Sequence, residues 1–92
     1  MDSEYIRVLI LEYMKDVGAT NINKGIAKGS IVFKVIQKAN LNDNMESLIE
    51  KEIEHLHTID IIRSMFDEYN EVGKLVGYSI KAEEEKFYLN IN

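Results

Sequence analysis

The chain has 92 residues, which is enough for one domain spanning residues 1–92 and too few for two domains with separate hydrophobic cores. With 46% hydrophobic and 29% charged residues, its composition is that of a globular protein and excludes a disordered one. It has no cysteine for disulfides or thiolate chemistry, and its apolar runs are too short to span a membrane, so we expect a cytoplasmic protein without membrane contact.

The charges, which sum to −5, are unevenly distributed along the chain. Residues 17–42 contain no acid and four lysines, whereas residues 43–72 contain nine acids and only two basic residues. This layout predicts a basic patch and an acidic region, which suits a self-complementary homodimer or a surface with separate sites for anionic and cationic partners. The alternative is solvated surface on separate elements. The four lysines of the predicted basic patch are Lys24, Lys28, Lys34 and Lys38.

Residues 3–18 have the pattern of an amphipathic helix that ends at Gly18, a residue suited to the left-handed conformation. Val8 and Leu11 fall outside its main apolar stripe and form a second, smaller apolar patch. Either another element of the chain or a second subunit must cover this patch. The main stripe consists of Ile6, Leu9, Ile10, Tyr13, Met14 and Val17.

Residues 18–30, with three glycines, are expected to form a loop, with a short extended piece at residues 20–23. The segment that follows, residues 30–38, is ambiguous. A helical period gathers Ser30, Lys34 and Lys38 on one side, whereas the many β-branched residues favour a strand. We expect residues 31–36 to be extended, because a third strand would make the C-terminal hairpin into a stable sheet.

Residues 42–73 predict two helices rather than one. The apolar stripe from Met45 to Leu56 is rotated by more than about 90° from the stripe that begins at Ile59, which predicts a break near His57 and Thr58. Gly73 is expected to end the second helix.

The C-terminal residues alternate apolar and polar side chains in two runs, 74–82 and 86–92, joined at residues 82–85. This pattern predicts a β-hairpin with one face on the core. The whole chain is therefore predicted to be a two-layer α+β domain in the order helix, strand, helix, helix, strand, strand. The strand at residues 31–36 would lie beside the hairpin and parallel to the hairpin strand next to it. The alternative is a winged helix-turn-helix domain whose wing is the hairpin.

No group of residues predicts catalysis, a cofactor or a metal site. His55 and His57, the only histidines, would point about 200° apart on a helix and so cannot bind one metal ion together. Glu52 and His55 have the spacing of half a di-iron carboxylate site, but the second half is missing. No serine lies in a nucleophile motif. We therefore expect no enzymatic activity.

The remaining function is interaction with other proteins. In the winged-helix alternative, a DNA-binding transcriptional regulator, the recognition helix would bring Glu50 and Glu54 towards phosphates, so nucleic acid is disfavoured as a partner. We expect a regulatory module that binds itself as a homodimer and binds another protein, as an adaptor or an acidic inhibitor. The predicted interface residues are Val8, Leu11, Glu50 and Glu54.

Overall fold

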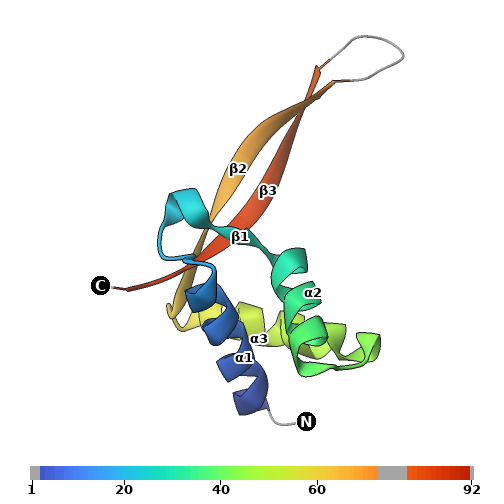
Figure 1. Ribbon diagram of the computed structural model, residues 1–92. Coiled ribbons are helices and arrows are strands. Elements are labelled where there is room, and N and C mark those ends of the chain that lie inside the picture. Colours follow the sequence, from blue (N-terminus) through green and yellow to red (C-terminus); the bar gives the residue numbers. More distant parts are fainter. Residues whose placement is uncertain (1–2, 73–78, 92) are drawn as a thin grey trace.

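The computed structural model describes the backbone of residues 3–72 and 79–91 and the side chains of residues 3–66 and 84–91. Within these ranges three helices and a three-stranded antiparallel sheet form an α+β fold (Figure 1). The helices are α1 (Ser3–Asp16), α2 (Lys28–Ala39) and α3 (Glu46–Thr58). The strands are β1 (Ile26–Ala27), β2 (Ile62–Val72) and β3 (Ser79–Leu89). Two short 3-10 helices, η1 (Ile22–Lys24) and η2 (Asp43–Met45), precede β1 and α3.

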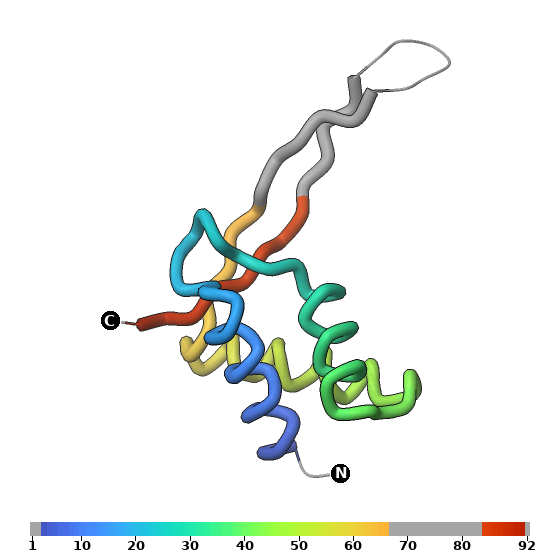
Figure 2. The backbone as a smooth tube through the Cα atoms, in the orientation of Figure 1, coloured from blue at the N-terminus to red at the C-terminus, as the bar shows by residue number. Residues whose placement is uncertain are grey.

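In the sheet, β3 lies between β1 and β2, and both pairings are antiparallel. The short strand β1 places Ile26 opposite Phe87, and β2 pairs with β3 along its full length, beginning with Ile62 opposite Leu89. The end of β3 also lies beside the end of α1, where the Leu89 N–H donates to the Ala19 carbonyl over 2.7 Å (Figure 2). The order of elements and the hairpin of β2 and β3 are as predicted, but the predicted parallel pairing is wrong.

The core lies where the three helices meet the first part of the sheet. In α1 the buried residues Ile6, Ile10 and Met14 are four apart, so they form one stripe along the helix. Each such side chain stabilises the fold by about 1.5–3 kcal/mol when it is fully buried. The other buried hydrophobic residues are Ala19, Ile31, Val32, Val35, Ile49, Ile53, Leu56, Ile62, Phe87 and Leu89.

The prediction that residues 31–36 form a strand is wrong, because they lie inside α2. In this helix Ile31, Val32 and Val35 are all buried, which the helical period allows and an alternating strand would not. Their burial, at about 1.5–3 kcal/mol per side chain, outweighs a helix propensity cost of less than about 0.7 kcal/mol per β-branched residue. Asn40 then ends α2 in the left-handed conformation, with a φ of 52°. The third strand is instead the two-residue β1, in the segment predicted to be a loop.

The predicted break in residues 42–73 is confirmed, because α3 ends at Thr58. The predicted second helix is wrong, since residues from Ile62 onwards form β2. Asp60, with a φ of 64°, turns the chain out of α3. Ile62 is then buried on the core side, and β3 supplies the hydrogen-bonding partner that a strand requires. The rotated apolar stripe therefore marked a change of secondary structure and not a second helix.

The predicted hairpin is confirmed, but its boundaries are wrong: residues 82–85, expected to connect the two strands, lie within β3. Phe87 and Leu89 are buried, as the alternation predicted, whereas Ile91 is exposed. Gly73, expected to end a helix, lies outside the described residues, as do Val76 and Tyr78 of the first predicted strand. None of the helices in the described part of the chain is long and apolar enough to cross a membrane.

Candidate functional site

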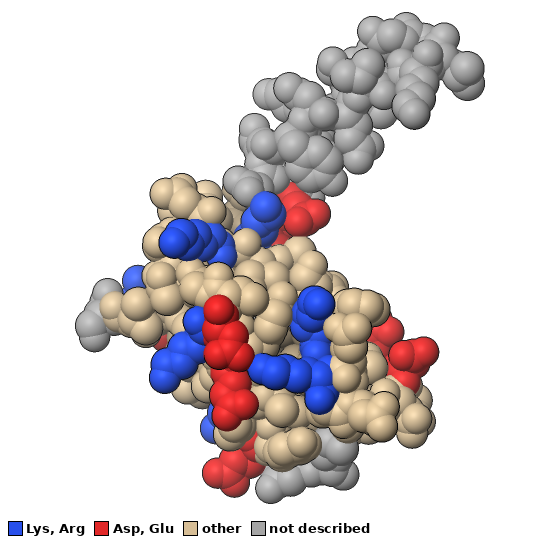
Figure 3. All heavy atoms as spheres, in the orientation of Figure 1, with Lys and Arg blue, Asp and Glu red and all other residues tan. Residues whose placement is uncertain are grey.

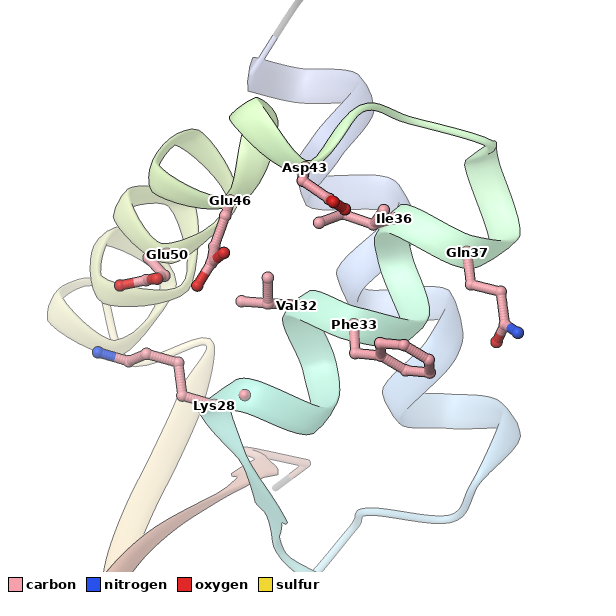
Figure 4. A pocket seen from close by; sticks show the side chains of 9 residues that line it. Lys28, Val32, Phe33, Ile36, Gln37, Asp43, Glu46 and Glu50 are labelled. Atoms are coloured by element: carbon pink, nitrogen blue, oxygen red, sulfur yellow. The ribbon is translucent and has the colours of Figure 1, made fainter.

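A groove of about 460 Å³ lies between α2 and α3. Burial of Ile31 and Val35 against the core leaves Phe33 at the surface of α2, and the turn after α2 sets the start of α3 beside this surface. Residues from both helices line the groove (Figure 4). They are Lys28, Gly29, Val32, Phe33, Ile36 and Gln37 from α2, and Asp43, Glu46 and Glu50 from η2 and α3.

The two walls of the groove differ in chemistry. On the α2 side, Val32 and Ile36 present apolar surface, and Phe33 is 61% exposed at the rim. On the α3 side the lining side chains are carboxylates, and Figure 4 shows Glu46 extending towards Val32. Such a site combines an apolar surface with several negative charges, which suits a ligand with an apolar part and a positive charge.

The position of Glu46 has a local explanation, but that of Glu50 does not. Glu46 lies in the first turn of α3, where the positive end of the helix dipole favours a carboxylate. Glu50 lies one turn further along, beyond the reach of this effect, and its negative charge is four residues from that of Glu46. Like charges at this spacing destabilise a helix by about 0.2–0.5 kcal/mol. The acidic wall is therefore not a simple consequence of helix formation.

Lys28 lies at one end of the groove and is held by two neighbours. Its Nζ atom is 3.3 Å from Oε1 of Glu54 and 5.9 Å from the centre of the Phe87 ring. Both contacts hold the ammonium group against residues of the same chain, Glu54 and Phe87. Lys28 therefore compensates Glu54, which was a predicted interface residue, and contributes little free positive charge to the groove.

A second hollow, of about 510 Å³, lies between α1 and α2 on the other side of α2. Tyr13 and Val17 line it together with Lys34 and the ion pair of Lys38 with Asp16. The hydrogen bond from Lys38 Nζ to Asp16 Oδ2, over 3.0 Å, raises the pKa of Lys38 above its usual value. This hollow therefore has charges of both signs.

The four lysines of the predicted basic patch, Lys24, Lys28, Lys34 and Lys38, are spread over η1 and both sides of α2. Lys28 and Lys38 are paired with acids, and Lys34 Nζ donates to Gln37 Oε1 over 3.3 Å. Figure 3 accordingly shows positive and negative side chains interspersed on the face that it draws. One of these ion pairs, Lys28 with Glu54, joins the segment without acids to the acidic segment.

The four predicted interface residues lie on two separate helices. Val8, on α1, is 46% exposed, but Leu11 is half-buried against the core. Glu50 and Glu54 lie on α3, at the groove and at Lys28 respectively. Neither hollow contains members of both pairs. Their role in an interface stays a prediction.

Glu52 and His55, which have the spacing of half a di-iron site, lie in different environments on α3. Glu52 is buried and binds Arg7 of α1, with 2.8 Å between Arg7 Nε and Glu52 Oε1, whereas His55 is exposed. Within residues 3–66 and 84–91, no group of three or more histidines, aspartates and glutamates lies close enough to hold a metal ion. Glu52 lies three residues after Ile49 and four before Leu56, which places it in the buried stripe of α3.

Ser64 joins α3 to the sheet without the geometry of an activated nucleophile. Its hydroxyl donates to Glu85 Oε2 over 2.7 Å, and its oxygen lies 3.2 Å from His57 Nε2. A hydroxyl has one proton to donate, so while Ser64 donates to Glu85, the contact with His57 requires the tautomer that has its proton on Nε2. A base that activates a serine has to accept that proton instead. Sequence reasoning missed this cluster, because its three members come from different elements.

The comparisons with known proteins add no identification. No family model matches this sequence, and searches of curated proteins and of solved structures returned no match.

Proposed function

We propose that this chain is a winged helix-turn-helix module that acts without chemistry, by binding another protein through the surface formed by α2 and α3. The order of elements supports the first part of this proposal, because α2 and α3 follow one another through a short turn and a β-hairpin follows α3. The strand order, with β3 between β1 and β2, is also consistent with it.

The charge of α3 supports a protein partner over DNA. In a helix-turn-helix domain the second helix enters the major groove, which would bring Glu46, Glu50 and Glu54 close to DNA with only Lys51 to offset them. Affinity for DNA comes largely from lysines and arginines that neutralise phosphates. Residues 67–85 of the hairpin sequence contain six acids and two lysines, so their net charge is negative, like that of α3. This acidic α3 is the observation that carries the proposal.

A homodimer in the cytoplasm is the form that we propose for the module. The exposed apolar side chains of Tyr5 and Val8, one turn apart on α1, support self-association through that helix, away from the groove. The absence of cysteine supports a reducing compartment. Light scattering at tens of micromolar protein tests the dimer, and the mass of a single chain there would contradict it.

DNA binding tests the choice between the two functions that this topology supports, a protein-binding module and a transcriptional regulator. We expect no saturable binding of a mixed-sequence DNA duplex at about 200 mM salt, measured by fluorescence anisotropy. The variant Glu46→Lys/Glu50→Lys/Glu54→Lys should acquire duplex binding that weakens steeply between about 50 and 200 mM salt. Tight binding by the unchanged chain would overturn the proposal, and a variant without any binding would contradict the assignment of α3.

Site-directed photo-crosslinking in extracts of the source cell tests for a protein partner. A photoreactive phenylalanine analogue is placed at Phe33, on the α2–α3 surface, and in a matched chain at Tyr5 on α1. We expect position 33 to give adducts with another protein that nuclease treatment leaves unchanged. Adducts that nuclease removes would overturn the proposal in favour of nucleic acid.

A further inference from the structure

We propose that the groove between α2 and α3 binds a basic amphipathic helix of another protein. Apolar side chains of that helix enter the groove, and its lysines or arginines contact the acidic wall. This inference rests on the proposed function, because it assumes a protein partner, and it goes further by specifying the chemistry of the partner and the residues that recognise it.

The size and the apolar surface of the groove fit large aliphatic side chains. Its volume of about 460 Å³ is roughly three times that of the cavity of about 150 Å³ that accepts one benzene molecule. Val32 is buried beneath the groove, whereas Phe33 is mostly exposed and Ile36 is half-buried. Phe33 is thus a large aromatic side chain held by a rigid helix beside an apolar hollow, which is a typical position for an anchor residue of a protein interface.

The acidic wall specifies the charge of the partner. The ion pairs between described residues join Glu52, Glu54, Asp16 and Asp60 to their partners, and include none of Asp43, Glu46 and Glu50. None of the three groove carboxylates therefore has a lysine or arginine of the described residues within 4.0 Å, and Lys28, which also lines the groove, is paired with Glu54. A cation bound between Glu46 and Glu50 would relieve the repulsion between them, and so the groove favours a basic ligand electrostatically.

A helix is the form of ligand that fits best between two helices. An amphipathic helix presents apolar side chains every three to four residues and can place a lysine or arginine beside each of them. A second copy of this chain fits less well as the ligand. The lysines that its α2 could offer to the groove, Lys34 and Lys38, line the hollow on the opposite side of that helix, and Lys38 is already bound to Asp16. Nucleic acid would be repelled by the same carboxylates that attract a basic helix.

The experiment uses as probe a synthetic helical peptide of leucine and lysine, with leucines at positions i, i+3, i+4 and i+7. It is titrated into the ¹⁵N-labelled full chain, and backbone amide shifts are followed by NMR. We expect saturable shifts concentrated in residues 28–37 and 43–50, and none with a peptide in which glutamate replaces every lysine. The two peptides have the same apolar face, so this difference isolates the contribution of charge.

Variants of the chain test whether the groove itself binds the peptide. Phe33→Ala and, separately, Glu46→Gln/Glu50→Gln should each weaken binding by about tenfold or more, the scale of an interface anchor or of several lost charge contacts. Phe66→Ala is the matched control for the aromatic residue, because Phe66 is 59% exposed on β2 and Phe33 is 61% exposed. Glu12→Gln, in an exposed residue of α1, is the control for lost charge. Both controls should bind as the unchanged chain does.

The possible failures can be told apart. Equal loss in the groove variants and in their controls would mean that the peptide binds the surface non-specifically, and it would overturn the inference. Shifts in residues 28–37 that grow with protein concentration in the absence of peptide would overturn it in favour of a second copy. Adducts through position 5 of α1 with a protein other than a second copy of this chain, with none through position 33, would overturn both the groove and the proposed α2–α3 surface, while leaving protein binding itself in place.

Discussion

Arg7 on α1 and Glu52 on α3 form the one ion pair in the described part of the chain that has a buried member. Their Nε and Oε1 atoms are 2.8 Å apart, and Glu52 is only 7% exposed. The pair joins α1 to α3 through residues that are 45 positions apart in the sequence. Because the carboxylate has lost most of its hydration, the guanidinium group is what makes its burial tolerable.

Loss of Arg7 should therefore cost more than the pair itself contributes. We expect Arg7→Met to lower the free energy of unfolding by about 2 kcal/mol, because it leaves a buried carboxylate without a partner. The double variant Arg7→Met/Glu52→Leu should recover most of this loss, since it replaces both charges with apolar side chains. Urea unfolding of the chain, the two single variants and the double variant gives the coupling free energy between the residues. Additive effects would show that the two residues do not depend on each other.

Gly25 allows β1 to lie against β3. A Cβ atom at this position would be 2.9 Å from Cβ of Lys86, closer than real Cβ atoms approach. We expect Gly25→Ala to lower the free energy of unfolding by about 1–3 kcal/mol, because the strands must move apart. Gly29→Ala is the matched control, since a Cβ atom there meets nothing within 4 Å. It should stabilise α2 by up to about 1 kcal/mol, and thermal unfolding measures both changes.

Asn40 ends α2 with a φ of 52°, a conformation that glycine adopts more easily than any other residue. Asn40→Gly should therefore be neutral or stabilise the fold by a few tenths of a kcal/mol, whereas Asn40→Val should destabilise it by about 1–2 kcal/mol. Chemical unfolding of the two variants distinguishes them. Equal stability would mean that the left-handed turn contributes nothing to the end of the helix.

The sequence was sufficient to predict α1, because apolar periodicity and an ending glycine agree there. Residues 31–36 could not be assigned, because β-branched composition and helical period disagree and only packing decides between them. Burial of Ile31, Val32 and Val35 on one side of α2 is a tertiary effect. The start of β2 was hidden for a related reason, since Ile62 fits both the helical and the alternating pattern until β3 pairs with it.

The candidate site was only partly predictable. A helical interpretation of residues 30–38 puts Phe33 about 200° from Ile31, so its exposure could have been found from the sequence once the helix was accepted. The groove itself depends on the placement of α2 beside α3, which no local pattern specifies. The pairing of Glu54 with Lys28 likewise joins residues 26 apart, so no local pattern of the sequence could have predicted it.

Asp60, between α3 and β2, gives the last prediction, a dependence of stability on pH. Hydrogen bonding to Arg63, with a smaller contribution from the charge on His57, lowers the pKa of Asp60 below its usual value of 3.8. A lowered pKa means that the ionised form stabilises the fold above the pKa of the unfolded chain, and that this stabilisation is lost as the pH falls through the lower, folded value. We expect Asp60→Asn to be less stable than the unchanged chain at about pH 7 and equally reduced at about pH 5, with the difference shrinking below about pH 3.8.

Asparagine also tolerates the φ of 64° at this position, so the substitution tests charge and not backbone strain. Urea unfolding at these pH values measures the difference, and the variant Arg63→Gln should lose the same pH-dependent part. A difference that stays constant down to about pH 3 would show that the carboxylate does not stabilise the turn through its charge.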